Sequence, residues 1–168
     1  MVFRAGFRCF FLGAALFSAI AIALWLLRLQ SYAGTSPLGV AWHAHEMLFG
    51  YVVAVLTGFL TIRLSGRRLA FLFVLWLLAR ILLVFPDTGL SLAGAVADLL
   101  FIPALIALRE PALWSVRKWP NGVFLPLLAA FWLADLGFHL SGRGPATLAS
   151  DPNLRDAALD LFSILLVA

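Results

Sequence analysis

Long apolar stretches dominate this chain and leave few folds open to it. They run from Cys9 to Leu27, Trp42 to Ile62, Leu69 to Phe85, Leu90 to Leu108 and Gly122 to Leu140. A helix that crosses a bilayer needs ~20 apolar residues, because the hydrocarbon core is ~30 Å thick. The pattern therefore predicts an all-α fold, a polytopic transmembrane helix bundle with five complete spans.

The composition agrees with a membrane protein. Hydrophobic residues make up 64% of the chain and charged residues 12%, and the mean hydropathy is +1.04. Soluble domains are about half apolar and about a quarter charged. The net charge is +4, but the basic residues are scattered between apolar stretches, which argues against a nucleic-acid partner and favours the lipid bilayer. The single cysteine, Cys9, excludes an internal disulfide.

A sixth apolar stretch begins near Asp156 and consists only of Ala157 to Ala168. This is about half of a crossing, and a half-crossed helix leaves backbone groups and apolar surface in the wrong solvent. We therefore expect a truncated sixth span. Residues 1–168 are expected to be a single transmembrane domain and the N-terminal part of a longer protein.

Basic residues are distributed unevenly between the two ends of the predicted spans. One side carries Arg4, Arg8, Arg63, Arg67, Arg68, Arg109, Arg117 and Lys118, whereas the other carries Arg28, Arg143 and Arg155. Connections rich in Lys and Arg stay on the cytoplasmic side. This bias predicts a multi-pass protein with a cytoplasmic N-terminus.

Polar side chains gather at the predicted outer ends of two spans. The motif WHAHEMLFG places His43, His45 and Glu46 in the first turns of the second span, and His139 ends the fifth. Asp135 precedes His139 by four residues, a spacing that lets a carboxylate orient a ligating imidazole. We expect the three histidines to converge in one leaflet as candidate metal ligands.

Helical geometry restricts the two histidines of the motif. Residues i and i+2 are ~200° apart on a helix, so His43 and His45 cannot both bind one metal from a regular helix. A line of small residues below Glu46 predicts a close-packing stripe, formed by Gly50, Ala54 and Gly58. The inward face should then bear Glu46 and His43. His43 is the preferred ligand and His45 the alternative, while capping or interfacial roles remain open for both.

Two further charges lie inside predicted spans. Arg80 is at a depth similar to that of Glu46, and could pair with Glu46 or Asp135 or extend to the interface. Asp98 lies ~12 Å into the fourth span, where a carboxylate typically marks an interhelical hydrogen bond or a proton path.

Several segments resemble the NnrS family of polytopic bacterial membrane proteins. The long motif from Trp42 to Tyr51 is similar to the family signature, and Gly6-Phe7-Arg8 followed by Phe10-Phe11 resembles its GFRPFF element, with Cys9 in place of proline. The segments from Ala97 to Phe101 and from Asp156 to Leu161 are also similar. The sequence departs from the family at IRLSGRR, after Thr61, where members have a longer segment.

The resemblance implies a haem- and copper-containing inner-membrane protein that acts on or responds to nitric oxide, in denitrification and nitrosative stress. It makes His43 and His45 candidate haem or copper ligands, since imidazole suits both metals. It leaves the reaction and any catalytic residues open. Family members have about twice as many spans, so ligands from later helices would be missing. Two alternatives remain: a metal-free carrier with a polar path through Glu46, Arg80 and Asp98, and a non-catalytic membrane fragment.

Overall fold

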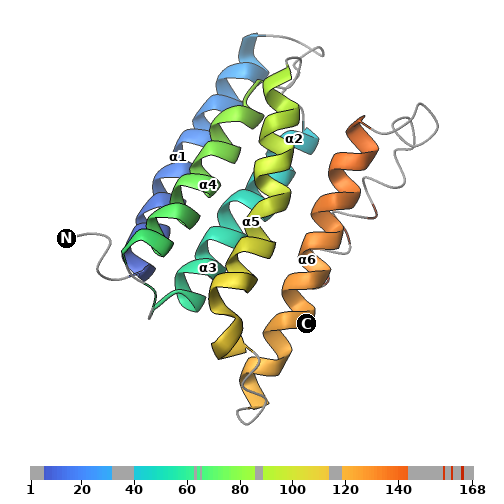
Figure 1. Ribbon diagram of the computed structural model, residues 1–168. Coiled ribbons are helices and arrows are strands. Elements are labelled where there is room, and N and C mark those ends of the chain that lie inside the picture. The colour runs from blue at the N-terminus through green and yellow to red at the C-terminus, as the bar shows by residue number, and fades with distance from the viewer. Residues whose placement is uncertain are drawn as a thin grey trace. The chain divides into compact units, whose positions relative to one another are not determined.

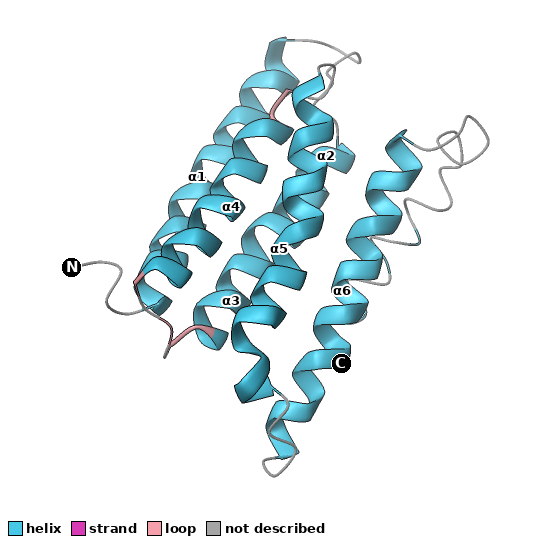
Figure 2. Ribbon diagram, in the orientation of Figure 1, coloured by secondary structure: helices cyan, strands magenta, loops and turns pink. Residues whose placement is uncertain are grey.

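The computed structural model describes residues 6–31, 40–62, 64, 66–85, 89–113, 119–143, 157, 160 and 164. The elements found there are all helical (Figures 1 and 2): α1 (Gly6–Ser31), α2 (Val40–His45), the π-helix η2 (Glu46–Val52), α3 (Val53–Leu60), α4 (Arg67–Leu83), α5 (Gly89–Leu113) and α6 (Trp119–Arg143). The chain forms two compact units, Met1–Asp98 and Leu99–Ala168.

Four of the predicted spans are confirmed as helices that are long and apolar enough to cross a membrane. Within the described residues these segments are Arg8–Leu27, Val40–Leu60, Gly89–Leu108 and Phe124–Ser141. An all-helical fold is therefore confirmed for the described part of the chain.

The prediction of five complete spans and a truncated sixth is not supported beyond these four. The third predicted span corresponds to α4, which has 17 residues and carries Arg67 and Arg68 at its start and Arg80 near its end. At 1.5 Å per residue such a helix is ~25 Å long, shorter than the ~30 Å hydrocarbon core. The predicted sixth span lies outside the described residues, apart from Ala157, Asp160 and Ile164.

The first unit is built around the packing of α1 on η2 and α3. Gly58 of α3 faces the side chains of Phe10 and Phe11, which would be 3.4–3.5 Å from an added Cβ. Phe10 is fully buried and meets Phe73 and Trp76 of α4 edge to face, with ring centroids 5.6 and 6.3 Å apart. These aromatic contacts join α1 to α4.

The second span changes its helical register partway along. It starts as α-helix in α2, widens into the π-helix η2, and returns to α-helix in α3. The indole of Trp76 donates a hydrogen bond of 3.0 Å to the Gly50 carbonyl within η2. Short π-helical segments often occur at functional sites, because they redirect the side chains of the surrounding turns.

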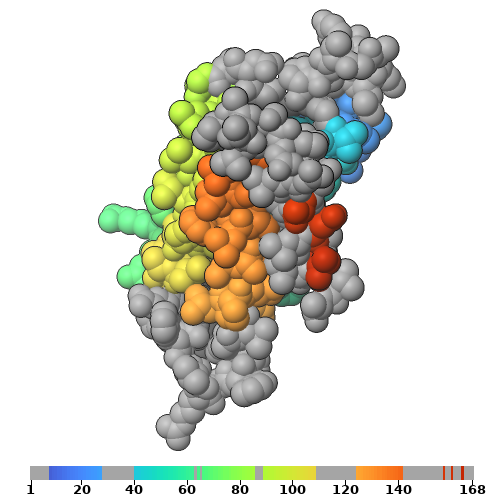
Figure 3. All heavy atoms as spheres, turned by 90° about the vertical axis from the view of Figure 1, so that its right-hand side faces the viewer, coloured from blue at the N-terminus to red at the C-terminus, as the bar shows by residue number. Residues whose placement is uncertain are grey.

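In the second unit, α6 packs on the later part of α5. The Trp132 indole donates a 2.7 Å hydrogen bond to the Leu99 carbonyl, and Leu105, Leu128 and Phe131 are buried. Helix α6, orange in Figure 3, also exposes apolar side chains, among them Leu133 and Leu140. Such exposure suits a helix that faces lipid.

Candidate functional site

The polar residues of the opening motif sit where α2 gives way to η2. His45 is the last residue of α2 and Glu46 the first of η2, and both are buried, with exposures of 1% and 0%. They lie at the start of the candidate span Val40–Leu60. A buried carboxylate at such a position requires charged or hydrogen-bonding partners.

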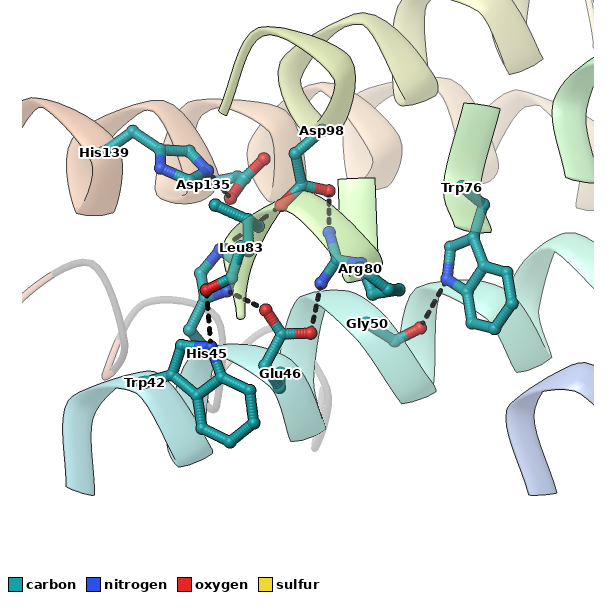
Figure 4. A network of polar contacts seen from close by, with 10 residues as sticks. All are labelled: Trp42, His45, Glu46, Gly50, Trp76, Arg80, Leu83, Asp98, Asp135 and His139. Carbon is teal, nitrogen blue, oxygen red and sulfur yellow. Dashed lines mark hydrogen bonds and ion pairs between the residues drawn. The ribbon is translucent and has the colours of Figure 1, made fainter. Parts of the chain in front are cut away.

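Arg80 of α4 supplies the main partner of Glu46. Its guanidinium donates a hydrogen bond of 2.8 Å from Nη1 to Glu46 Oε2, and its Nη2 forms an ion pair with Asp98 Oδ1 of α5 (Figure 4). Arg80 is 2% exposed and Asp98 6%. The planar guanidinium fork can address two carboxylates at once. Arg80 thus ties three helical segments of the first unit together.

His45 closes this arrangement from the other side. Its Nδ1 lies 3.4 Å from Glu46 Oε1, and its Nε2 lies 3.5 Å from Asp98 Oδ2. Both ring nitrogens therefore face carboxylate oxygens, as Figure 4 shows. We call the four residues His45, Glu46, Arg80 and Asp98 the buried quartet.

The lack of a side chain at Gly50 leaves room for the buried quartet. A Cβ at this position would lie 2.8 Å from Phe17 Cε1, 2.9 Å from Arg80 Nη1 and 3.1 Å from Glu46 Oε2. The first two distances are shorter than real Cβ contacts allow. Only glycine lets the arginine–glutamate pair pass so close to the backbone of η2.

His43 has a different environment from His45. Its ring stacks on the Trp25 indole of α1, with centroids 4.1 Å apart and planes 9° from parallel. Its Nδ1 is buried and has no hydrogen-bond partner among the described residues. His43 is only partly buried as a residue.

This outcome differs from the expected inward face, which paired Glu46 with His43. The structure pairs Glu46 with His45 instead. The second span has neighbours on two sides, with Trp25 of α1 meeting His43 and Arg80 of α4 meeting Glu46. The expectation of one inward face therefore could not hold.

Trp42, the first residue of the motif, fastens the start of the span to the end of α4. Its indole donates a hydrogen bond of 3.1 Å to the Leu83 carbonyl. The last carbonyls of a helix have no partner within the helix, so this bond satisfies one of them.

In the second unit, α6 carries the remaining predicted pair. His139 Nε2 lies 3.4 Å from Asp135 Oδ1, at the expected i, i+4 spacing, and both residues are buried. The carboxylate is close enough to orient the imidazole.

Sequence reasoning found most of these residues but missed several contacts. It gave pairing with Glu46 as one of three options for Arg80, placed Trp25 only as an interfacial residue and assigned no role to Trp76. Interfacial tryptophans signal only a depth in the membrane. Nothing in the sequence links Trp76 to a backbone carbonyl 26 residues away.

Comparison with known families agrees with the resemblance seen in the sequence. The family model for NnrS, described as NnrS protein, matches residues 1–168, which is the whole chain. No match is found among curated proteins or among solved structures. The match over the full length, together with four helices able to cross a membrane, leads to one conclusion: the chain belongs to the NnrS family of nitric-oxide-associated membrane proteins.

Proposed function

We propose that this chain is part of a haem- and copper-containing protein of the bacterial inner membrane, which acts in nitric oxide metabolism or in resistance to nitrosative stress. The NnrS family is associated with haem and copper. The proposal includes a multi-pass topology with a cytoplasmic N-terminus, based on the distribution of Lys and Arg. Nitric oxide is the proposed small-molecule partner.

The observation that carries the proposal is the environment of the His43 ring. Within the part of the chain that the structure describes, its Nδ1 is buried without a hydrogen-bond partner, and an imidazole nitrogen in that state is a good donor to haem iron or copper. Stacking on Trp25 fixes the plane of the ring. The donor chemistry therefore fits the group that the family implies, with His43 as the proposed ligand.

The other two histidines differ in how ready they are to bind a metal. Both nitrogens of His45 face carboxylates, so a metal there would be held together with a carboxylate such as Asp98 and not by the imidazole alone. His139 has Asp135 beside one ring nitrogen, the arrangement that commonly orients a ligating imidazole. We propose His139 as a metal ligand of the second unit in its own right, with Asp135 as the residue that orients it.

A bound haem or copper would supply nitric oxide binding and one-electron chemistry. The protein's own contribution is to hold the ligating imidazole in an apolar environment at the start of a span. The buried quartet fixes the helix that carries His43, because Arg80 ties Glu46 to Asp98.

The buried quartet also supports a second candidate function, a metal-free carrier. Charged residues inside the membrane often mark ion or proton pathways, and three of them, Glu46, Arg80 and Asp98, converge here beside His45. In that case Asp98→Asn would abolish proton flux into liposomes that contain the purified chain, and no metal would be present.

The proposal is tested by the visible spectrum and metal content of the chain purified in mild detergent. We expect a Soret band and bound copper, and a shift of the Soret band when nitric oxide is added. A folded but colourless and metal-free chain contradicts the haem and copper assignment. Proton flux would then favour the carrier, and its absence a non-catalytic fragment.

A further inference from the structure

An apolar groove runs along the first unit between α1 and α4. Its volume is about 540 Å³, and its walls come from α1 residues between Gly13 and Leu24 and from α4 residues between Phe73 and Ile81, continuing to Phe85. Figure 1 shows α1 and α4 in blue and green. Pockets of ~300–1,000 Å³ are typical of sites that hold an organic ligand. The groove is thus large enough to hold one.

One end of the groove lies near Gly13 and the other near Trp42. Near Gly13 the two helices meet closely, since an added Cβ would lie 2.7 Å from the Phe73 ring. At the other end the walls include Trp42 and Phe85. Trp42 lies at the start of a candidate span, where tryptophan marks the boundary between membrane and water. The groove therefore runs from the interface toward the middle of the bilayer.

The groove is somewhat longer than half of the hydrocarbon core. From Gly13 to Leu24 the α1 axis rises by ~17 Å, at 1.5 Å per residue, and half of the ~30 Å core is ~15 Å. Both residues lie within the candidate span Arg8–Leu27, so the groove passes the middle of that span. A hydrocarbon chain that enters at the Trp42 end could therefore extend along the groove to beyond the middle of the bilayer.

The groove is continuous with the surface that faces lipid. Its rim includes Leu16 and Ile20 of α1 and Leu77 and Ile81 of α4, all of which are exposed. Helix α1 contains a candidate membrane span and has little of its surface buried. Acyl chains that solvate this surface therefore have direct access to the groove.

The chemistry of the walls selects the kind of ligand. Arg80 is the only charged residue among them, and its guanidinium is occupied by Glu46 and Asp98. The Trp42 and Trp76 indole N–H groups donate to the carbonyls of Leu83 and Gly50. Among the described residues the groove thus offers almost entirely apolar surface. Such walls favour a saturated hydrocarbon over a ligand with a polar group along its length.

We propose that this groove is a lipid-binding site that holds one acyl chain of a membrane phospholipid from the leaflet on the Trp42 side. The headgroup stays at the interface, beside the start of α2. The bound chain completes the packing between α1 and α4 and is independent of any metal bound elsewhere.

Photolabelling in vesicles tests this site. The chain is reconstituted in phosphatidylethanolamine and phosphatidylglycerol, with a trace of phospholipid that carries a diazirine at the end of one acyl chain. We expect the label to concentrate on groove residues near Gly13 and Phe73. The matched variants place tryptophan inside or outside the groove on each helix: Leu16→Trp against Leu12→Trp, and Leu77→Trp against Leu78→Trp.

The two residues of each pair are similarly exposed: Leu16 and Leu12 by 65% and 64%, and Leu77 and Leu78 by 40% and 45%. Of each pair, only the first residue lines the groove. Each groove variant should lower the labelling of groove residues about tenfold. This corresponds to ~1.4 kcal/mol, or to the removal of about two methylene groups of the acyl chain from apolar contact. The outer variants should leave the labelling unchanged. Equal labelling of the whole exposed face of α1, or a groove shielded from label by protein, overturns the proposal.

Discussion

Replacing Arg80 with methionine is expected to lower the free energy of unfolding in detergent by about 3–5 kcal/mol. Methionine is also long and unbranched, so the variant removes mainly the positive charge. Arg80 is 2% exposed and pairs with both Glu46 and Asp98. Without it two carboxylates remain buried together with no arginine between them. Unfolding monitored by circular dichroism during titration with sodium dodecyl sulfate measures the change.

The control removes the carboxylate charges as well. In the triple variant Arg80→Met, Glu46→Gln, Asp98→Asn no formal charge of the three is left, and most of the lost free energy should return, because neutral replacements of a buried ionic group are often tolerated. Arg80→Lys keeps the charge but lacks the fork that reaches two carboxylates, so it should fall between the wild type and Arg80→Met. An Arg80→Met variant as stable as the wild type would contradict the described pairing.

Replacing Gly50 with alanine is expected to lower the free energy of unfolding by about 1–3 kcal/mol, as overpacking of a buried site does. The added methyl group would lie 2.8–3.1 Å from Phe17, Arg80 and Glu46. These side chains cannot easily yield, because two of them are held in a buried ion pair. The same detergent titration measures the effect.

Gly58→Ala is the matched control for Gly50→Ala. Gly58 is also buried in the second span, but its added methyl group would find ordinary contacts at 3.4–3.5 Å. Since alanine favours a helix over glycine by up to ~1 kcal/mol, Gly58→Ala should be neutral or stabilising. The cost of Gly50→Ala should also shrink in the Arg80→Met background, because the two residues are in contact. Equal effects of the two alanine variants would refute the special role of Gly50.

The sequence was informative wherever the physics is local or depends only on depth. Four spans could be predicted, because apolar length alone determines whether a helix can cross a membrane. The same depth argument gave Glu46 as one of the possible partners of Arg80. It was less informative for α4, a helix of 17 residues with arginines at both ends, because the stretch of 17 residues predicted as a span is not supported as one.

The finer arrangement of the site depends on contacts between distant residues. The π-helix η2 is held in part by the Trp76 bond to Gly50, which has no counterpart in local sequence. The pairing of Asp98 with Arg80 depends on how α5 lies against α4, and helical spacing within one span does not contain that information. For the same reason the burial of His45 rather than His43 could not be predicted.

The central claim is that the opening motif divides its histidines, with His45 held by carboxylates and His43 available as a metal ligand. The most direct test is the haem and copper content of His43→Gln and His45→Gln, measured on the folded, monodisperse fraction of each. His43→Gln should lower the amount of bound metal at least about tenfold. Loss of a residue that only hydrogen-bonds to a metal ligand already lowers metal affinity by about this factor, so loss of a ligand should cost at least as much. His45→Gln should keep most of the metal but be less stable. Loss of metal in His45→Gln alone, or in neither variant, would contradict this division of roles.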